Sequence, residues 1–104
     1  RRKMTNTEKQ LLLKALTKAR RLLKDGKRWI KGEYHRQGKG YCLLGAIAEC
    51  ETTLIEHVHR AIPRYVNDGN RVDRVIEYND APRRTWNQIK AVLDKTERSI
   101  RGQK

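Results

Sequence analysis

The chain has 104 residues, of which 25 are Lys or Arg and 12 are Asp or Glu, and its formal net charge is +13. This length suits one domain with a modest core, so we expect a single basic helical domain over residues 1–104, frayed at residues 1–4 and 101–104. No apolar run approaches the roughly 18 residues of a membrane span, and no signal-peptide pattern opens the chain, so these patterns argue against a membrane-spanning or secreted protein.

The positive charge is concentrated in the first part of the chain. Residues 1–41 contain 14 basic and 3 acidic residues, a net charge of +11, whereas residues 42–104 contain 11 basic and 9 acidic residues, a net charge of +2. An excess of one sign attracts partners of the opposite charge and accelerates their capture. We therefore expect any polyanion-binding surface to lie within the first 41 residues.

The first predicted helix begins after Thr5 and runs to about Lys24. Thr5 and Glu8 have the spacing of a capping box, and Gly26 is suited to end the helix. One side of the helix is apolar and consists of Leu12, Leu16, Ala19 and Leu23, flanked by Leu11, Ala15 and Leu22. The other side is basic and consists of Lys14, Lys18, Arg21 and Lys24, with Lys9 and Arg20 at its edge. The pattern predicts an amphipathic helix that packs its apolar side into the core.

Residues 27–40 have no helical period and contain three glycines, Trp29, Tyr34 and five Lys or Arg residues. This composition predicts a basic loop, with a short extended stretch near residues 29–34. We expect Trp29 to belong to the core rather than to a stacking surface, because Trp is highly buried on average.

Residues 41–50 are the least polar ten residues of the chain and predict a central helix. Cys42, Gly45 and Ala46 share one side, where their small side chains let another backbone approach closely. Cys42 and Cys50 are eight residues apart, about 12 Å along a helix, which is too far for a disulfide within it. Two unpaired thiols indicate a reducing compartment, so we expect a cytoplasmic protein.

Three further helices follow along the chain. The first runs from Thr52 or Thr53 to Ile62 before Pro63. The spacing of the apolar residues in 72–78 suits a short helix slightly better than a strand. Turns are expected at residues 67–70 and 79–82. Thr85 and Gln88 repeat the capping-box spacing and open a last helix that ends near Ile100. The expected fold is all-α: a small compact bundle of four to five short helices with one basic loop.

Three short motifs occur in a distinctive order: Cys42-Leu43-Leu44-Gly45-Ala46, Asn79-Asp80 and Arg84-Thr85. In this order the chain resembles an uncharacterised family of small bacterial and phage proteins marked by Cys-Leu-x-Gly-Ala, Asn-Asp and Arg-Thr. The resemblance covers roughly residues 29–95 and implies an origin and one structural unit rather than an activity. We expect Asn79 or Asp80 to satisfy backbone amides at the turn into the last helix, which Thr85 caps. Arg83 and Arg84 are expected to be an exposed pair.

The charge distribution favours a non-enzymatic protein that binds DNA or RNA through phosphates. Aromatic residues among cations also suit the stacking of unpaired bases. No helix-turn-helix spacing or zinc-finger ligand set indicates sequence-specific recognition. The expected nucleic-acid-binding residues are Lys14, Lys18, Arg21, Lys24, Lys27, Arg28, Lys31, Tyr34, Arg36 and Lys39.

The sequence leaves four alternatives open. An acidic protein partner would use the same positive charge, and the chain would then be an adaptor or inhibitor. A thiol enzyme would use Cys42 with His57 and Asn79, but small buried cysteines are common in cores. A metal site would use Cys42, Cys50, His57 and His59, whose spacing matches no standard zinc pattern. A membrane surface would bind the basic amphipathic first helix, but the apolar side of this helix has no Trp or Phe and is needed for the core. We therefore expect no catalytic residues, no metal, no cofactor and no membrane partner, and the oligomeric state stays open.

Overall fold

The computed structural model consists mostly of helices. The structure describes residues 4–63 and 70–102, so most of the turn expected at residues 67–70 lies outside the described residues. The helices are α1 (Asn6–Leu23), α2 (Leu43–Cys50), α3 (Leu54–Ala61), α4 (Arg71–Asp80) and α5 (Trp86–Arg101). A 3-10 turn, η1 (Lys24–Gly26), follows α1, and two short strands, β1 (His35–Arg36) and β2 (Gly40–Tyr41), precede α2.

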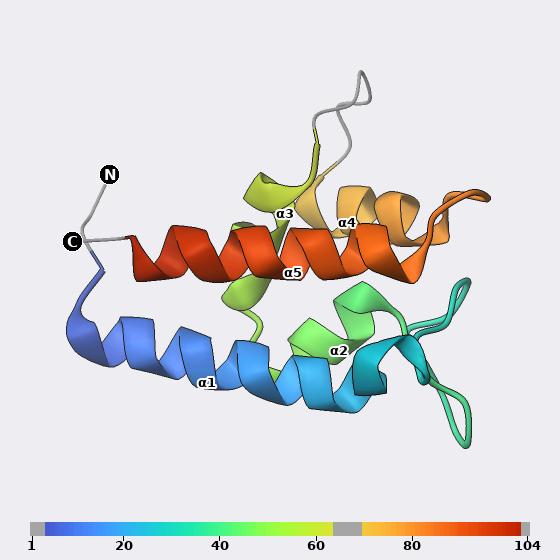
Figure 1. Ribbon diagram of the computed structural model, residues 1–104, viewed down its shortest axis with the longest axis horizontal. Coiled ribbons are helices and arrows are strands. Elements are labelled where there is room, and N and C mark those ends of the chain that lie inside the picture. Colours follow the sequence, from blue (N-terminus) through green and yellow to red (C-terminus); the bar gives the residue numbers. More distant parts are fainter. Residues whose placement is uncertain (1–3, 64–69, 103–104) are drawn as a thin grey trace.

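The two long helices, α1 and α5, lie side by side and run in opposite directions, so the described ends of the chain are at the same end of the molecule (Figure 1). Helix α2 packs mainly against α1, and α3 packs mainly against α5. Helix α4 contacts both α2 and α3. The core lies between these helices, and the predicted small all-α bundle is confirmed.

Helix α1 forms as its sequence pattern predicts. The amide of Glu8 donates to Thr5 Oγ1 at 3.1 Å and the amide of Thr5 donates to Glu8 Oε1 at 3.0 Å, which completes the capping box. The predicted apolar side is buried at Leu12, Ala15, Leu16, Ala19 and Leu23. Leu11, expected to flank this side, is instead 51% exposed, because its neighbours on the helix surface are polar residues such as Gln10 and Lys14.

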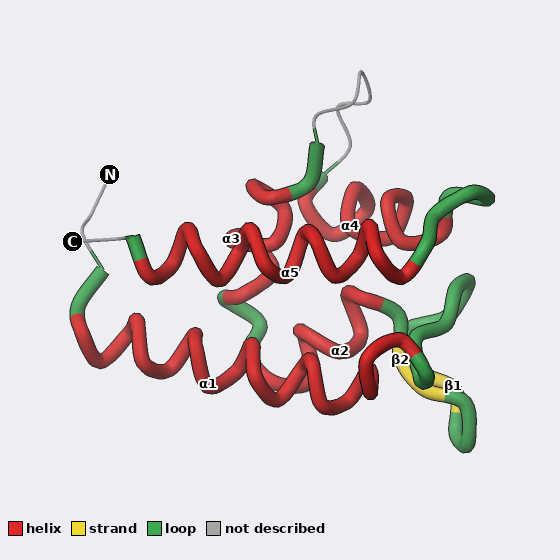
Figure 2. Tube along the Cα trace, viewed as in Figure 1, coloured by secondary structure: helices red, strands yellow, loops and turns green. Residues whose placement is uncertain are grey.

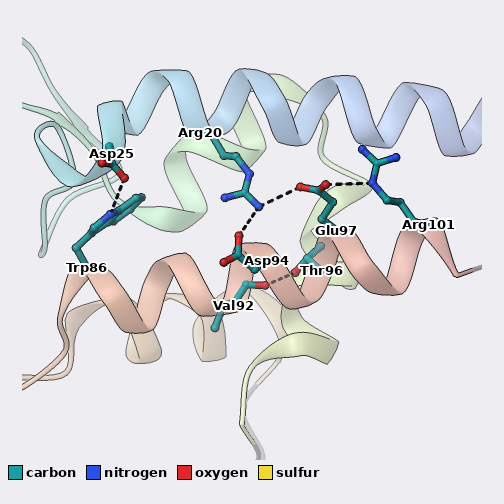
Figure 3. Close-up of polar contacts among 8 residues, drawn as sticks. All are labelled: Arg20, Asp25, Trp86, Val92, Asp94, Thr96, Glu97 and Arg101. Carbon is teal, nitrogen blue, oxygen red and sulfur yellow. Dashed lines mark hydrogen bonds and ion pairs between the residues drawn. The ribbon is translucent and has the colours of Figure 1, made fainter.

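Polar contacts hold α1 and η1 against α5 (Figure 3). Arg20 donates to Asp94 at 2.9 Å and to Glu97 at 3.2 Å, so this cation is neutralised within the fold. At the start of α5, Trp86 Nε1 donates to Asp25 Oδ1 of η1 at 3.3 Å. The indole also packs on Gly26, where an added Cβ would lie 2.6 Å from Trp86 Cγ. Gly26 therefore does more than end the helix, because no larger residue fits beneath the ring.

The extended structure near the basic loop lies later in the chain than expected. Strands β1 and β2 pair as an antiparallel hairpin, with His35 opposite Tyr41 and Arg36 opposite Gly40 (Figure 2). Within the predicted range of 29–34, the strand-like contact is the single bridge from Trp29 to Tyr41. The glycines decide the position, because Gly38 and Gly40 have φ values of +79° and +141°, which favour glycine.

Both ends of the described chain are more ordered than the expected fraying. Met4 packs against the core, and Arg101 completes α5 with an Nε–Oε2 ion pair to Glu97 of 3.0 Å. The other residues expected to fray, 1–3 and 103–104, lie outside the described part of the chain.

The cap of α5 can be tested by mutation. Thr85 Oγ1 accepts from the amide of Gln88 at 3.3 Å, so Thr85→Ala removes an N-cap acceptor and should lower the free energy of unfolding by about 1 kcal/mol. Thr85→Ser keeps the hydroxyl and is the matched control. Urea unfolding followed by circular dichroism measures both variants, and equal stabilities for Ala and Ser would contradict the capping role.

Candidate functional site

The side chain of Asn79 joins the basic loop to two helices. It is completely buried in the last turn of α4 and makes four hydrogen bonds. Its Oδ1 accepts from Trp29 Nε1 at 2.6 Å and from the amide of Leu43 at 2.9 Å, and its Nδ2 donates to the carbonyl of Ile30 at 3.0 Å and to Asp80 Oδ1 at 2.9 Å. The expectation that this residue serves the turn into the last helix is wrong, because α4 continues through Asp80 and points the amide inward.

Asp80 and Lys31 complete the attachment of the loop to α4. Asp80 Oδ1 accepts from the amide of Gly32 at 2.9 Å. Lys31 Nζ donates to the carbonyl of Ala81 at 2.8 Å and lies 5.6 Å from the centroid of the Trp29 ring. Lys31, predicted to contact phosphate, therefore already has partners within the fold.

The motif at residues 42–46 holds the loop against the start of α2. Cys42 is the N-cap of α2, and its Sγ accepts from the amide of Gly45 at 3.3 Å. The amide of Cys42 donates to the carbonyl of Tyr34 at 3.0 Å. An added Cβ on Gly45 would overlap that same carbonyl oxygen, and Ala46 is completely buried. The predicted close approach of another backbone is confirmed, and the approaching backbone is that of Tyr34.

The third motif, Arg84-Thr85, stabilises the turn between α4 and α5. Arg84 Nε donates to the carbonyl of Tyr78 at 2.7 Å, and its guanidinium carbon lies 3.6 Å from the centroid of the Tyr78 ring. The expectation of an exposed Arg83–Arg84 pair is therefore wrong for Arg84, which is half-buried, whereas Arg83 is exposed. The three motifs form a framework: residues 42–46 and Asn79-Asp80 hold residues 29–41 in place, and Arg84-Thr85 fixes the turn that follows α4.

The cations predicted to bind phosphate fall into separate groups. Lys14, Lys18 and Arg21 are exposed on one face of α1, and we call them the α1 basic stripe. None of the three forms an ion pair with another described residue. Lys24 and Lys27 are exposed where the helix ends.

The loop cations differ in how available they are. Arg28 is half-buried, and Arg36 pairs with Glu33 at 3.1 Å. Lys39 is exposed in the turn of the hairpin. Trp29 packs against the core, as expected, whereas Tyr34 is 54% exposed. The exposed members of the predicted set in residues 27–40 are therefore Lys27, Lys31, Tyr34, Arg36 and Lys39. Lys31 and Arg36 among them already have partners within the fold.

Two depressions flank α2. The aromatic pocket, of about 530 Å³, is lined by Tyr34, His35 and Tyr41, by Leu44 and Glu49 of α2, and by Val72 of α4, among others. The cationic pocket, of about 370 Å³, is lined by Lys18, Arg21, Leu22, Glu49 and Cys50. Glu49 therefore borders both. No local pattern in the sequence points to His35, Glu49 or Val72, because the pocket forms only when the hairpin, α2 and α4 come together in the fold.

The alternative chemistries receive little support from the geometry. Burial raises the pKa of the Cys42 thiol, so the neutral thiol predominates near pH 7 despite its place at a helix N-terminus. The four hydrogen bonds of Asn79 are made to other groups, so this amide does not orient a catalytic histidine. No group of three or more His, Cys, Asp or Glu side chains within residues 4–63 and 70–102 is arranged to hold a metal ion.

The chain was compared with known proteins at the level of families, sequences and structures. Residues 7–99 match a family of unknown function, DUF6197. The chain belongs to this family. The DUF6197 match includes the framework motifs, the α1 basic stripe and most of α5. No curated protein matches the chain, and no solved structure does either. Among the described helices, none has the length and apolar character needed to cross a membrane.

The role of Asn79 gives a stability prediction. Asn79→Ala leaves two backbone groups and the Trp29 indole without their partner, so we expect the free energy of unfolding to fall by about 3 kcal/mol. Asn87→Ala is the matched control, because Asn87 is exposed on α5. Both are measured by urea unfolding, and a loss below about 1 kcal/mol for Asn79→Ala would refute the role of Asn79 as the central anchor.

The thiols give a second prediction. Burial raises the pKa of both thiols, but it covers the sulfur of Cys42 more completely than that of the half-buried Cys50. We therefore expect iodoacetamide to label Cys42 of the folded chain far more slowly than Cys50. Mass spectrometry after timed labelling measures each site, and the urea-unfolded chain is the control in which both react. Rapid labelling of Cys42 alone would instead support a nucleophile.

Proposed function

We propose that this DUF6197 chain is a non-enzymatic nucleic-acid-binding protein that contacts phosphates through the α1 basic stripe and the hairpin end of the basic loop. The observation that carries the proposal is the contrast between two sets of α1 cations. Arg20 is neutralised by Asp94 and Glu97 of α5, whereas Lys14, Lys18 and Arg21 face solvent without an ion pair among the described residues.

The spacing of the α1 basic stripe suits a row of phosphates. Lys14 and Arg21 are seven residues apart, which corresponds to about 10 Å along a helix. Phosphates along one strand of duplex DNA are spaced by about 3.4 Å along the axis, so the stripe covers about three of them. Lys24 and Lys27 extend the positive charge beyond the helix end, and Lys39 adds to it from the hairpin.

Further observations support the other parts of the proposal. The buried, neutral thiol of Cys42 favours a structural role over catalysis. The free thiols Cys42 and Cys50 favour a reducing, cytoplasmic location. The order of the three motifs supports a bacterial or phage origin. The proposal covers both DNA and RNA, because phosphate contacts are common to both.

A salt titration tests the proposal. We expect labelled single-stranded and duplex DNA and RNA to bind at about 50 mM salt and to bind much more weakly at about 200 mM, because binding releases counterions. The triple variant Lys14→Gln, Lys18→Gln, Arg21→Gln should reduce the slope of log K against log salt by about 2 for a single strand.

A charge-matched control separates the stripe from net charge. Lys90→Gln, Lys95→Gln, Arg98→Gln removes three exposed cations from α5 and lowers the net charge equally. We expect this variant to retain nearly all of the affinity. Absence of binding by the wild-type chain to all four nucleic acids at low salt would refute the proposed function, and equal losses in the two triple variants would refute the role of the stripe.

A second candidate function, binding of an acidic protein as an adaptor or inhibitor, is favoured by one observation. Tyr34 and Val72 are 54% and 38% exposed, and both line the aromatic pocket beside the cations. Exposed apolar groups next to charge are common at protein interfaces. Such a complex would survive nuclease treatment, which distinguishes it from an assembly held by nucleic acid.

A further inference from the structure

The aromatic pocket contains three rings from one short segment of the chain. The rings of His35 and Tyr41 stack with centroids 4.4 Å apart and planes inclined by 29°. Tyr34 lines the same pocket and is 54% exposed, so its ring is accessible to a ligand. The volume of about 530 Å³ lies within the range of about 300–1,000 Å³ that is usual for small-molecule sites.

The backbone that carries Tyr34 is rigidly held. Its carbonyl accepts from the amide of Cys42 at 3.0 Å and lies against Gly45, where any side chain would overlap it. On the other side of the loop, Asp80 accepts from the amide of Gly32 at 2.9 Å. The motifs at residues 42–46 and Asn79-Asp80 thus fix the position of the backbone that carries this exposed aromatic side chain.

The aromatic pocket adjoins the cations of α1. Glu49 borders both the aromatic pocket and the cationic pocket that Lys18 and Arg21 line. A strand whose phosphates contact Lys18 and Arg21 therefore passes close to the aromatic pocket. The Glu49 carboxylate, exposed at the junction, accepts hydrogen bonds and is placed to meet base amino groups rather than phosphates.

From this arrangement we propose that the aromatic pocket binds an unpaired base of a single-stranded nucleic acid, with Tyr34 as the principal stacking surface. The inference rests on the proposed function and narrows it to single strands. Bases of a duplex are stacked inside it and do not reach a recessed ring, whereas bases of a single strand turn outward and stack on aromatic side chains. The positive charge beside the pocket favours this occupant over an uncharged apolar peptide.

An abasic strand separates base binding from phosphate binding. The probes are a labelled mixed-sequence single strand of about ten nucleotides and a strand of the same length made of abasic residues, which keeps the phosphates and lacks the bases. We expect the wild-type chain to bind the normal strand about five-fold or more tightly than the abasic strand. Tyr34→Ala should abolish this ratio without changing the affinity for the abasic strand, and Tyr34→Trp should restore it.

Leu11→Ala is the matched control, because Leu11 is an equally exposed large side chain that lies outside the aromatic pocket. We expect it to keep the wild-type ratio. Equal, salt-sensitive affinities of the wild-type chain for both strands would overturn the base pocket and leave the proposed function standing. Failure of both strands to bind would overturn both. Loss of the ratio in Leu11→Ala as well as in Tyr34→Ala would also overturn the assignment to this pocket, and an apolar protein contact would then be its better use.

Discussion

The buried carboxamide of Asn79 joins the indole of Trp29, the carbonyl of Ile30, the first amide of α2 and the carboxylate of Asp80. Residues 27–41 contain little regular structure beyond a short hairpin and the bridge from Trp29 to Tyr41. A buried polar group that is fully hydrogen-bonded imposes one geometry, because every alternative leaves a donor or an acceptor unpaired. The loop is thereby fixed to α2 and α4, and the positions of Tyr34, His35 and Tyr41 depend on it.

The charged and apolar residues of α1 lie on separate faces of the helix. The core-facing side is apolar, one edge pairs with α5 through Arg20, and the remaining face keeps Lys14, Lys18 and Arg21 in solvent. Unpaired like charges on one helix face repel one another, which costs some stability. In the proposed function the same charges attract a polyanion, and the stripe and the aromatic pocket form two parts of one binding surface.

Much of the fold could be predicted from residues close together in the chain. The capping boxes at Thr5 and Thr85, the buried side of α1 and the close approach at Gly45 depend on local spacing and on side-chain size, and all three are confirmed. The strands and the roles of Asn79 and Arg84 were predicted less well. Asn79 and Asp80 read as a turn because Asn, Asp and Pro cluster there, yet contacts with the loop some 50 residues earlier hold them in a helix.

The amino-acid sequence by itself determined the helical class, the helix caps, the central position of residues 43–47 and the concentration of positive charge before residue 42. These properties follow from periodicity, capping and composition, which act over a few residues. Only the tertiary structure decided which cations are available, since Arg20 and Lys31 find partners on α5 and after α4, whereas the α1 basic stripe forms no ion pair within residues 4–63 and 70–102. Likewise, only the tertiary structure assembled the aromatic pocket, because residues of the hairpin, α2, α3 and α4 line it and these segments meet only after folding.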